Sequence, residues 1–146
     1  MKKLLLYIVV AIVMVSCGVS IYYVVRNDEN IYATMSQEDR NYLNIDEEID
    51  IPVVHEKPNK KTSLKVECDS NTLTLDTETW KIKASQPGTA KVIVTSSNEH
   101  FGPFQFIFVV GNGSIENPYY IRNEADLRKI GDTWGLSDNY ELAEFE

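Results

Sequence analysis

The fold of this chain is decided by the segment from Trp80 to Thr95, which reads WKIKASQPGTAKVIVT. Apolar and polar residues alternate on both sides of a central Gln-Pro-Gly, which is the period of a β-strand with one buried face. The apolar positions are Trp80, Ile82 and Ala84 before the turn, and Ala90, Val92 and Val94 after it. Gly88 is expected to supply the positive φ that a turn after Pro87 requires. The segment therefore predicts two strands joined by a tight turn.

The same alternation continues outward from this segment. Its apolar positions are Ile49, Ile51 and Val53, then Leu64, Val66 and Cys68, then Leu73 and Leu75, and finally Phe104, Phe106, Phe108 and Val110. Stretches rich in Pro, Gly, Asn and Asp separate these runs, and no helical period lies between them. Six or seven short strands, each with one apolar face, need a second sheet to cover them. Residues 42–111 therefore predict an all-β, antiparallel sandwich.

Residues 80–95 resemble the second half of bacterial Ig-like domains of the group 2 type, in which a strand ending in Ala is followed by a Pro-Gly turn and Gly-Thr-Ala. The stretch from Leu43 to Pro52 resembles the opening strands of that family. Val66-Glu67-Cys68 stands where the family usually has Trp-x-Ser. The resemblance implies an Ig-like β-sandwich that serves as a spacer or binding module.

Residues 112–146 predict a strand, a short helix and a second strand, after a glycine-rich hinge at residues 111–114. Asn123 is expected to cap a helix that begins at Glu124, and Gly131 is expected to end it. Leu127 and Ile130 would form the apolar stripe of this helix. Residues 139–143 predict the second strand.

This C-terminal segment is similar to the opening unit of right-handed parallel β-helix repeats in bacterial surface proteins. The matching residues are Gly113-Ser114, Asn117-Pro118-Tyr119-Tyr120-Ile121, Asp126-Leu127 and Tyr140-Glu141-Leu142. The resemblance implies the start of a solenoid, which needs several stacked coils to bury its core. The sequence ends at Glu146, where the first coil would begin. The segment is therefore either part of a truncated product or a short cap-like element.

The N-terminus carries a membrane signal. Lys2 and Lys3 precede residues 4–25, which contain no charged side chain. About 20 apolar residues cross a bilayer core, and basic residues favour the cytoplasmic side, so this segment predicts a span with the C-terminus outside. Residues 1–25 are thus an expected anchor, and residues 26–41 an expected polar tether with a short helix opening at Ser36.

A second interpretation concerns Cys17. The stretch Met14-Val15-Ser16-Cys17-Gly18 resembles a bacterial lipobox, which implies a lipoprotein signal and lipidation at Cys17. The apolar residues 19–25 that follow favour a retained span instead, with Cys17 as one of its small residues. Both interpretations attach the protein to the cell membrane and place the bulk of the chain outside the cytoplasm.

Charge and cysteine content exclude several classes of protein. The chain has 14 basic and 22 acidic residues, and residues 112–146 alone hold 3 basic and 8 acidic ones. So acidic a surface repels phosphate groups and argues against nucleic-acid binding. Two cysteines exclude a disulfide-rich scaffold.

No catalytic constellation stands out. His55 and His100 are far apart in sequence, and a Cys68–His100 dyad is disfavoured because Cys68 follows the apolar phase of its strand. The acidic run at residues 46–50 lacks the spacing of a calcium loop. One interpretation of the aromatic residues is a sugar-binding platform made of Phe101, Phe104, Phe106 and Phe108. The alternation of the last three favours a core role instead. The sequence therefore predicts no catalytic residue, no metal site and no cofactor, and it leaves the ligand-binding residues unspecified.

The resulting expectation is a non-catalytic, membrane-anchored bacterial surface protein whose Ig-like module presents the C-terminal element outside the cell. Its expected partners are the membrane, through residues 4–25 or a lipid on Cys17, and a cell-surface polysaccharide or protein. One alternative is a truncated fragment of a larger β-helix adhesin or polysaccharide-active enzyme. Another is an assembly partner in which residues 140–143 pair with the sheet edge of another chain.

Overall fold

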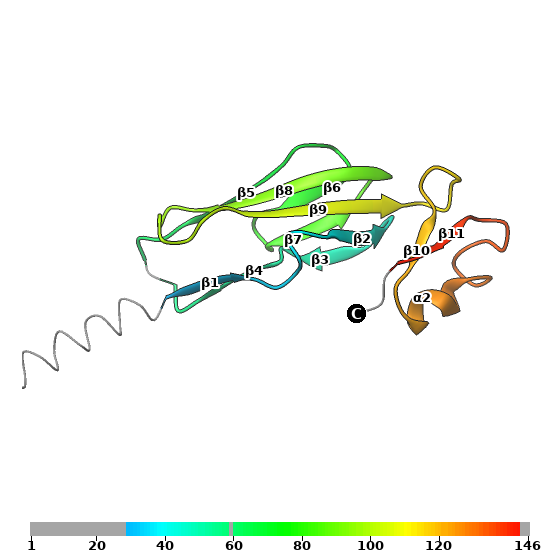
Figure 1. The fold of residues 1–146 in the computed structure, drawn as a ribbon, viewed down its shortest axis with the longest axis horizontal. Helices are drawn as coiled ribbons and strands as arrows, with labels where there is room; N and C mark the ends of the chain where they lie inside the picture. The colour runs from blue at the N-terminus through cyan, green and yellow to red at the C-terminus, as the bar shows by residue number, and fades with distance from the viewer. Residues whose placement is uncertain (1–28, 59, 144–146) are drawn as a thin grey trace, which may run out of the picture. The chain divides into compact units, whose positions relative to one another are not determined.

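Strands dominate the computed structural model, which describes residues 29–58 and 60–143 (Figure 1). The described residues contain eleven strands and one short helix, so the predicted all-β class is confirmed. They form two compact units. The larger holds residues 33–53 and 62–143, and the smaller holds residues 29–32 and 54–61 apart from residue 59.

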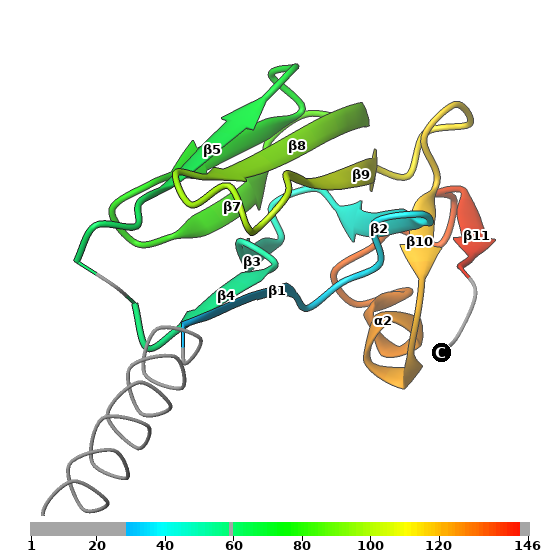
Figure 2. The ribbon, with the colours of Figure 1, turned by 60° about the vertical axis from the view of Figure 1, so that its left-hand side comes forward.

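The larger unit contains two sheets of the expected strands. A four-stranded sheet has the order β2 (Arg40–Asn44), β9 (Phe104–Gly111), β8 (Gly88–Ser96) and β5 (Leu64–Cys68). A three-stranded sheet has the order β3 (Glu48–Asp50), β7 (Lys81–Ala84) and β6 (Leu73–Asp76). Figure 2 shows both sheets from the side.

The prediction of a purely antiparallel arrangement is wrong at one strand pair. β2 runs parallel to β9, with Arg40 opposite Ile107 and Asn44 opposite Gly111. The pairs β5–β8, β8–β9, β3–β7 and β6–β7 are antiparallel, as expected. Alternation of apolar residues is the same in both kinds of pair, so the sequence pattern does not reveal strand direction.

The alternating apolar residues build the core of this unit. Phe106 and Phe108 from β9, Val92 and Val94 from β8, and Ile82 from β7 are fully buried. Burial of side chains of this size stabilises the fold by about 1.5–3 kcal/mol each. The expected turn is also present, because Gly88 has a φ of +129°.

Trp80 was predicted to lie in a strand, and this prediction is wrong. It lies in the turn before β7, where it is half-buried and has a φ of +59°. Asp76 shapes this turn, since its Oδ1 accepts hydrogen bonds from the N–H groups of Glu78 and Thr79. The indole Nε1 of Trp80 donates to the Val53 carbonyl at 3.4 Å, so the side chain still packs onto the unit.

Residues expected to form a tether contain regular structure. β1 (Asn30–Ala33) pairs with β4 (Val53–Glu56) in a two-stranded sheet. The helix expected at Ser36 is absent. The Ser36 hydroxyl nevertheless accepts from the N–H of Asp39, as a helix cap would, and donates to the Asp39 carboxylate. In the smaller unit, His55 Nε2 and Glu29 Oε1 lie 2.7 Å apart.

The predicted anchor, residues 4–25, and its Cys17 lie outside the described residues. Within residues 29–58 and 60–143, no helix is long and apolar enough to cross a membrane.

Candidate interaction site

The C-terminal element is a β–α–β unit made of β10 (Tyr119–Ile121), α2 (Glu124–Lys129) and β11 (Tyr140–Leu142). β10 and β11 are parallel, with Tyr119 opposite Tyr140 and Ile121 opposite Leu142. The Asn123 side chain accepts a hydrogen bond from the N–H of Asp126, which confirms the predicted helix cap. Gly131, with a φ of +81°, follows the helix as expected.

One face of this small sheet is covered by aromatic packing. The rings of Tyr119 and Trp134 stack with centroids 4.5 Å apart and planes 8° apart, and the Tyr140 ring lies 6.1 Å from each. Lys129 Nζ lies 4.9 Å from the centroid of the Trp134 ring, within the range of a cation–π contact. Trp134 is buried, so this cluster is a local core rather than an exposed platform.

The opposite face of the small sheet packs on β2 and β9. Val109, Tyr120 and Ala143 form a buried apolar cluster, with Tyr42 packed against it. The Tyr42 and Tyr120 ring centroids lie 4.5 Å apart. Val109 and Val110 are both buried although their side chains point to opposite faces of β9, since the C-terminal element covers the outer face.

Asn44 closes the outer edge of β10. Its side-chain amide donates to the Tyr120 carbonyl at 2.9 Å, and its Oδ1 accepts from the Tyr120 N–H at 2.7 Å. Asn44 is 1% exposed, so these bonds form away from water. The side chain thus takes the place that a neighbouring strand would have beside β10, and it joins β2 to the C-terminal element.

Arg122 makes a second polar link across the same interface. Its guanidinium donates to the Tyr42 carbonyl at 2.9 Å, to Glu47 Oε1 at 2.6 Å and to Asp126 Oδ2 at 2.9 Å. Lys129 Nζ adds a bond of 3.0 Å to Asp126 Oδ1. One cation therefore bridges a carbonyl of β2, an acid of the following turn and the only buried acid of α2.

The charges of this network alter the pKa of two groups. Burial acts to raise the pKa of the Asp126 carboxyl, but the hydrogen bonds from Arg122 and Lys129 outweigh it, and the pKa is lowered. Burial acts to lower the pKa of Arg122, and its bonds to Asp126 and Glu47 outweigh that effect, so the pKa is raised. Both groups therefore keep their charges, and the ion pairs persist at neutral pH.

Residues 111–114, the predicted hinge, pack closely on their neighbours and make several hydrogen bonds. A Cβ on Gly111 would lie 1.9 Å from the Pro118 carbonyl oxygen, so the backbone of the connection packs directly on β9. The N–H of Asn112 donates to the Asn117 carbonyl, and both the N–H and the side-chain amide of Asn139 donate to the Gly113 carbonyl. These bonds close the connection into a loop.

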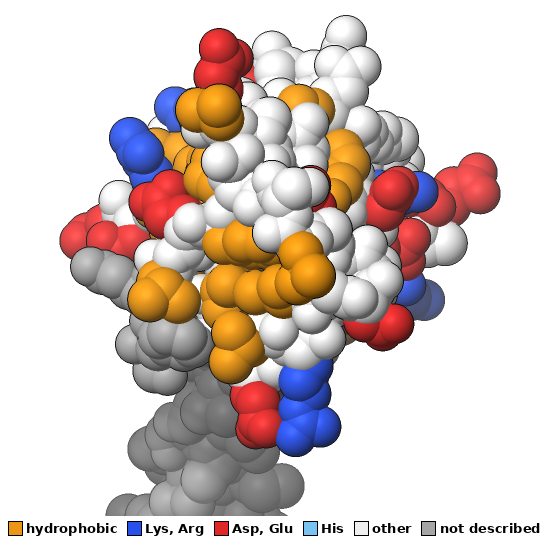
Figure 3. All heavy atoms as spheres, turned by 90° about the vertical axis from the view of Figure 1, so that its right-hand side faces the viewer, with side chains coloured by type: hydrophobic (Ala, Val, Ile, Leu, Met, Phe, Trp, Pro, Cys, Tyr) orange, Lys and Arg blue, Asp and Glu red, His pale blue; other side chains and the backbone are white. Residues whose placement is uncertain are grey.

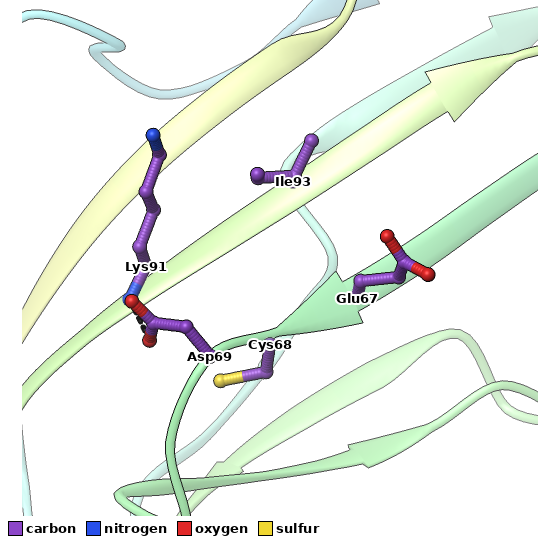
Figure 4. Close-up of a pocket in the computed structure, with 5 residues that line it drawn as sticks. All are labelled: Glu67, Cys68, Asp69, Lys91 and Ile93. Carbon is purple, nitrogen blue, oxygen red and sulfur yellow. Dashed lines mark hydrogen bonds between the residues drawn. The ribbon is translucent and has the colours of Figure 1, made fainter.

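The structure does not bring Cys68 and His100 together. Cys68 ends β5 opposite Val92, whereas His100 lies in the loop beyond Ser96, which pairs with Leu64 at the other end of β5. The Cys68 thiol is half-buried and donates to the Ser70 carbonyl. It lines a surface pocket with Glu67, Asp69, Lys91 and Ile93, in which Asp69 accepts from the Lys91 N–H (Figure 4). No histidine lines this pocket to activate the thiol.

Three of the four acids in residues 46–50 form ion pairs with cationic side chains. Asp46 pairs with Lys83, Glu48 with Lys81 and Glu47 with Arg122. Within residues 29–58 and 60–143, no group of three His, Cys, Asp or Glu side chains is placed to hold a metal ion. Of the aromatic residues, Phe106 and Phe108 are core, as predicted. Phe104, also predicted as core, is only half-buried, and so is Phe101.

The residues that build the interface were not identified from sequence. Asn44, Arg122 and Asp126 are single polar residues in segments where polar side chains are common. The sequence does carry one signal of this interface, the adjacent residues Val109 and Val110. Two consecutive apolar residues in an alternating strand indicate that both faces of the strand are buried. Leu127, expected to pack inward, is 54% exposed, and Asp126 is the helix residue that is buried.

Comparison with known proteins does not identify a family for this chain. No family model matches the sequence, and no curated protein matches it significantly. Among solved structures, a candidate alpha-galactosidase from Bacteroides fragilis NCTC 9343 is similar at 19% sequence identity and a TM-score of 0.38. The similarity covers 56% of this chain and 17% of that protein, so this chain spans a small part of its length. A similarity this weak carries no argument about activity.

Proposed function

We propose that this chain is a non-catalytic, membrane-anchored bacterial surface protein, in which an Ig-like sandwich holds the C-terminal β–α–β element in a fixed orientation outside the cell. The observation that carries the proposal is the polar interface of Asn44 and Arg122. A flexible attachment would not need a buried amide and a bridging guanidinium with every hydrogen bond made. The element is thus presented by the sandwich rather than trailing from it.

The path of the chain within the larger unit supports the proposal that the sandwich presents the C-terminal element. β2 begins at Arg40 and ends at Asn44, where the C-terminal element docks. The chain therefore enters β2 at one end, and the element lies at the other. Residues 4–25, or a lipid on Cys17, would supply the attachment to the membrane.

The mechanism in this proposal is mechanical. The sandwich sets the stiffness of the module, and the interface transmits that stiffness to β10, α2 and β11. A cell-surface polysaccharide or protein would then meet a surface of constant shape, which lowers the entropy lost on binding.

Fractionation with protease treatment of intact cells tests the proposal. We expect the full-length protein in the membrane fraction, and we expect added protease to cleave residues 29–146 on intact cells. An outer membrane would shield the protein, so cells with a permeabilised outer membrane are treated in parallel. Recovery in the cytoplasm, protected from protease under both conditions, would refute the proposal.

A second candidate is a fragment of a larger β-helix adhesin or polysaccharide-active enzyme. The parallel pairing of β10 and β11 favours it, because a parallel pair joined through a helix is a unit to which further parallel strands add. Reading the gene beyond the codon for Glu146 separates the two candidates. Continuing glycine-rich and apolar coils in any frame would favour the fragment, and an intergenic region would favour the short protein.

A further inference from the structure

The outer edge of β11 is the one open edge of the C-terminal element. β10 and β11 form a sheet of two strands, and no third strand lies beyond β11 in the described part of the chain. Asn139 accepts from Tyr119, and Ala143 donates to Ile121, so alternate residues of β11 face β10. The N–H and C=O groups of Tyr140 and Leu142 therefore point away from β10.

Other sides of this small sheet are covered in part, although Glu141 and Leu142 of β11 are exposed. Asn44 closes the outer edge of β10, Tyr42 and Val109 lie against one face, and Trp134 packs on the other. Parallel strands are normally found in larger sheets that are buried on both faces. The outer edge of β11 therefore leaves room for one more strand to pair with this sheet.

Exposed apolar side chains accompany the open edge. Leu142 on β11 is 70% exposed, and Leu136, which precedes the strand, is 84% exposed. Figure 3, which views the molecule from the side that carries the C-terminal element, shows hydrophobic side chains gathered in the middle, with both acidic and basic side chains around them. Single exposed leucines are ordinary, but an exposed leucine on an unpaired strand edge, as on β11, indicates an interaction surface.

The C-terminal segment that carries this edge has a negative net charge. Residues 112–146 contain 8 acidic and 3 basic residues, and the three basic ones are paired within the protein, Arg122 and Lys129 with Asp126, and Arg128 with Glu124. Glu141 is exposed on β11 itself. Two copies of the chain joined through β11 would bring like charges together, which argues against self-association.

We infer that β11 accepts, as an added strand, an extended segment of another protein in which apolar residues alternate with Lys or Arg. Main-chain hydrogen bonds would form with Tyr140 and Leu142, and the alternation would place apolar side chains beside Leu142 and basic ones beside Glu141. This inference deepens the proposed function by naming the kind of partner that the presented element binds, and it rests on that function.

The test uses the full-length protein in nanodiscs of zwitterionic lipid and a fluorescent peptide that alternates valine and lysine. We expect the peptide to bind, measured by anisotropy, and a peptide that alternates valine and glutamate to bind at least about tenfold more weakly. Empty nanodiscs correct for binding to lipid. Binding is also expected to slow hydrogen exchange at the amides of Tyr140 and Leu142.

Two variants locate the binding edge. Leu142→Pro removes an outward N–H but no hydrogen bond to β10, and we expect it to weaken binding at least about tenfold. Leu142→Val keeps that N–H and an apolar side chain, so its affinity should stay within about threefold of the wild type. Unchanged amide exchange in β10 shows that the element is intact in both variants.

Several outcomes would overturn the inference. These are equal binding of the two peptides, unchanged exchange at Tyr140 and Leu142 when the lysine peptide is added, and concentration-dependent dimerisation through β11. A protein that is membrane-bound and surface-exposed but ignores the peptide would refute only this inference. A cytoplasmic protein would refute the proposed function itself.

Discussion

At the scale of single residues, glycine is required at Gly111 by the close approach of two backbone segments. A side chain there would meet the Pro118 carbonyl at 1.9 Å, a distance that only a backbone shift relieves. We expect Gly111→Ala to lower the free energy of unfolding by about 1–3 kcal/mol, measured by chemical denaturation. Gly102→Ala is the matched control, because nothing lies within 4 Å of the added Cβ. Equal stability of the two variants would contradict the packing described for the connection.

Gly88 is required for a different reason, its φ of +129°. A β-branched residue cannot adopt that conformation without strain, so we expect Gly88→Val to lower the free energy of unfolding by about 1–3 kcal/mol. Space is not the limit, since an added Cβ would lie 3.5 Å from the Thr72 hydroxyl. Thr89→Val introduces valine at the next position, which is exposed, and should be nearly neutral. Unchanged thermal unfolding of Gly88→Val would exclude the turn conformation.

At the scale of elements, the docking of α2 and β10 on β2 depends on pH through Asp126. Its pKa is lowered in the folded state, so its contribution to stability is complete above the ordinary aspartate pKa and is lost as the pH falls below about 4. We therefore expect the difference in Tm between the wild type and Asp126→Asn to shrink between pH 6 and about pH 3.

Glu124→Gln is the control for this measurement. Glu124 lies on the same helix, but its side chain is 75% exposed, and its ion pair with Arg128 contributes little to stability. A Tm difference for Asp126→Asn that stays constant with pH would show that the carboxylate charge does not hold the interface together.

The elements themselves were largely predictable, and their connections were not. Alternation located β5 to β9, and the Asn123 cap and Gly131 located α2, because these signals depend on local backbone geometry. β1 escaped prediction because a short strand in a polar segment leaves no apolar pattern. The parallel pairing of β2 with β9 and the bonds of Asn44 join residues distant in sequence, and no local pattern encodes them.

At the scale of the whole molecule, the proposed attachment to the membrane depends on residues 4–25 and Cys17. Intact mass spectrometry of the membrane-extracted protein separates the two interpretations of this segment. A mass that includes residues 1–25 indicates a retained span, and a mass that begins at Cys17 with added acyl groups indicates a lipoprotein. Cys17→Ala should leave the mass pattern of a retained span unchanged apart from the substitution. A soluble protein with neither mass would contradict membrane attachment.

The excess of acidic over basic residues is concentrated in one part of the chain. Acidic residues exceed basic ones most strongly in residues 112–146, and the structure uses the few cations there to hold the element on the sandwich. On β11 itself, the acidic Glu141 and the apolar Leu142 are exposed. The charge is therefore suited to selecting a partner as well as to keeping the protein in solution.

The central claim is that the sandwich and the C-terminal element form one rigid body, and hydrogen exchange at the Tyr120 amide tests it most directly. In the full-length protein in detergent micelles, we expect this amide to exchange as slowly as the core amides of β8, because Asn44 Oδ1 holds it at 2.7 Å in a buried site. Asn44→Ala should speed its exchange by at least about a hundredfold and leave β8 unchanged. Exchange of the wild-type Tyr120 amide at the rate of an unprotected amide would contradict the account.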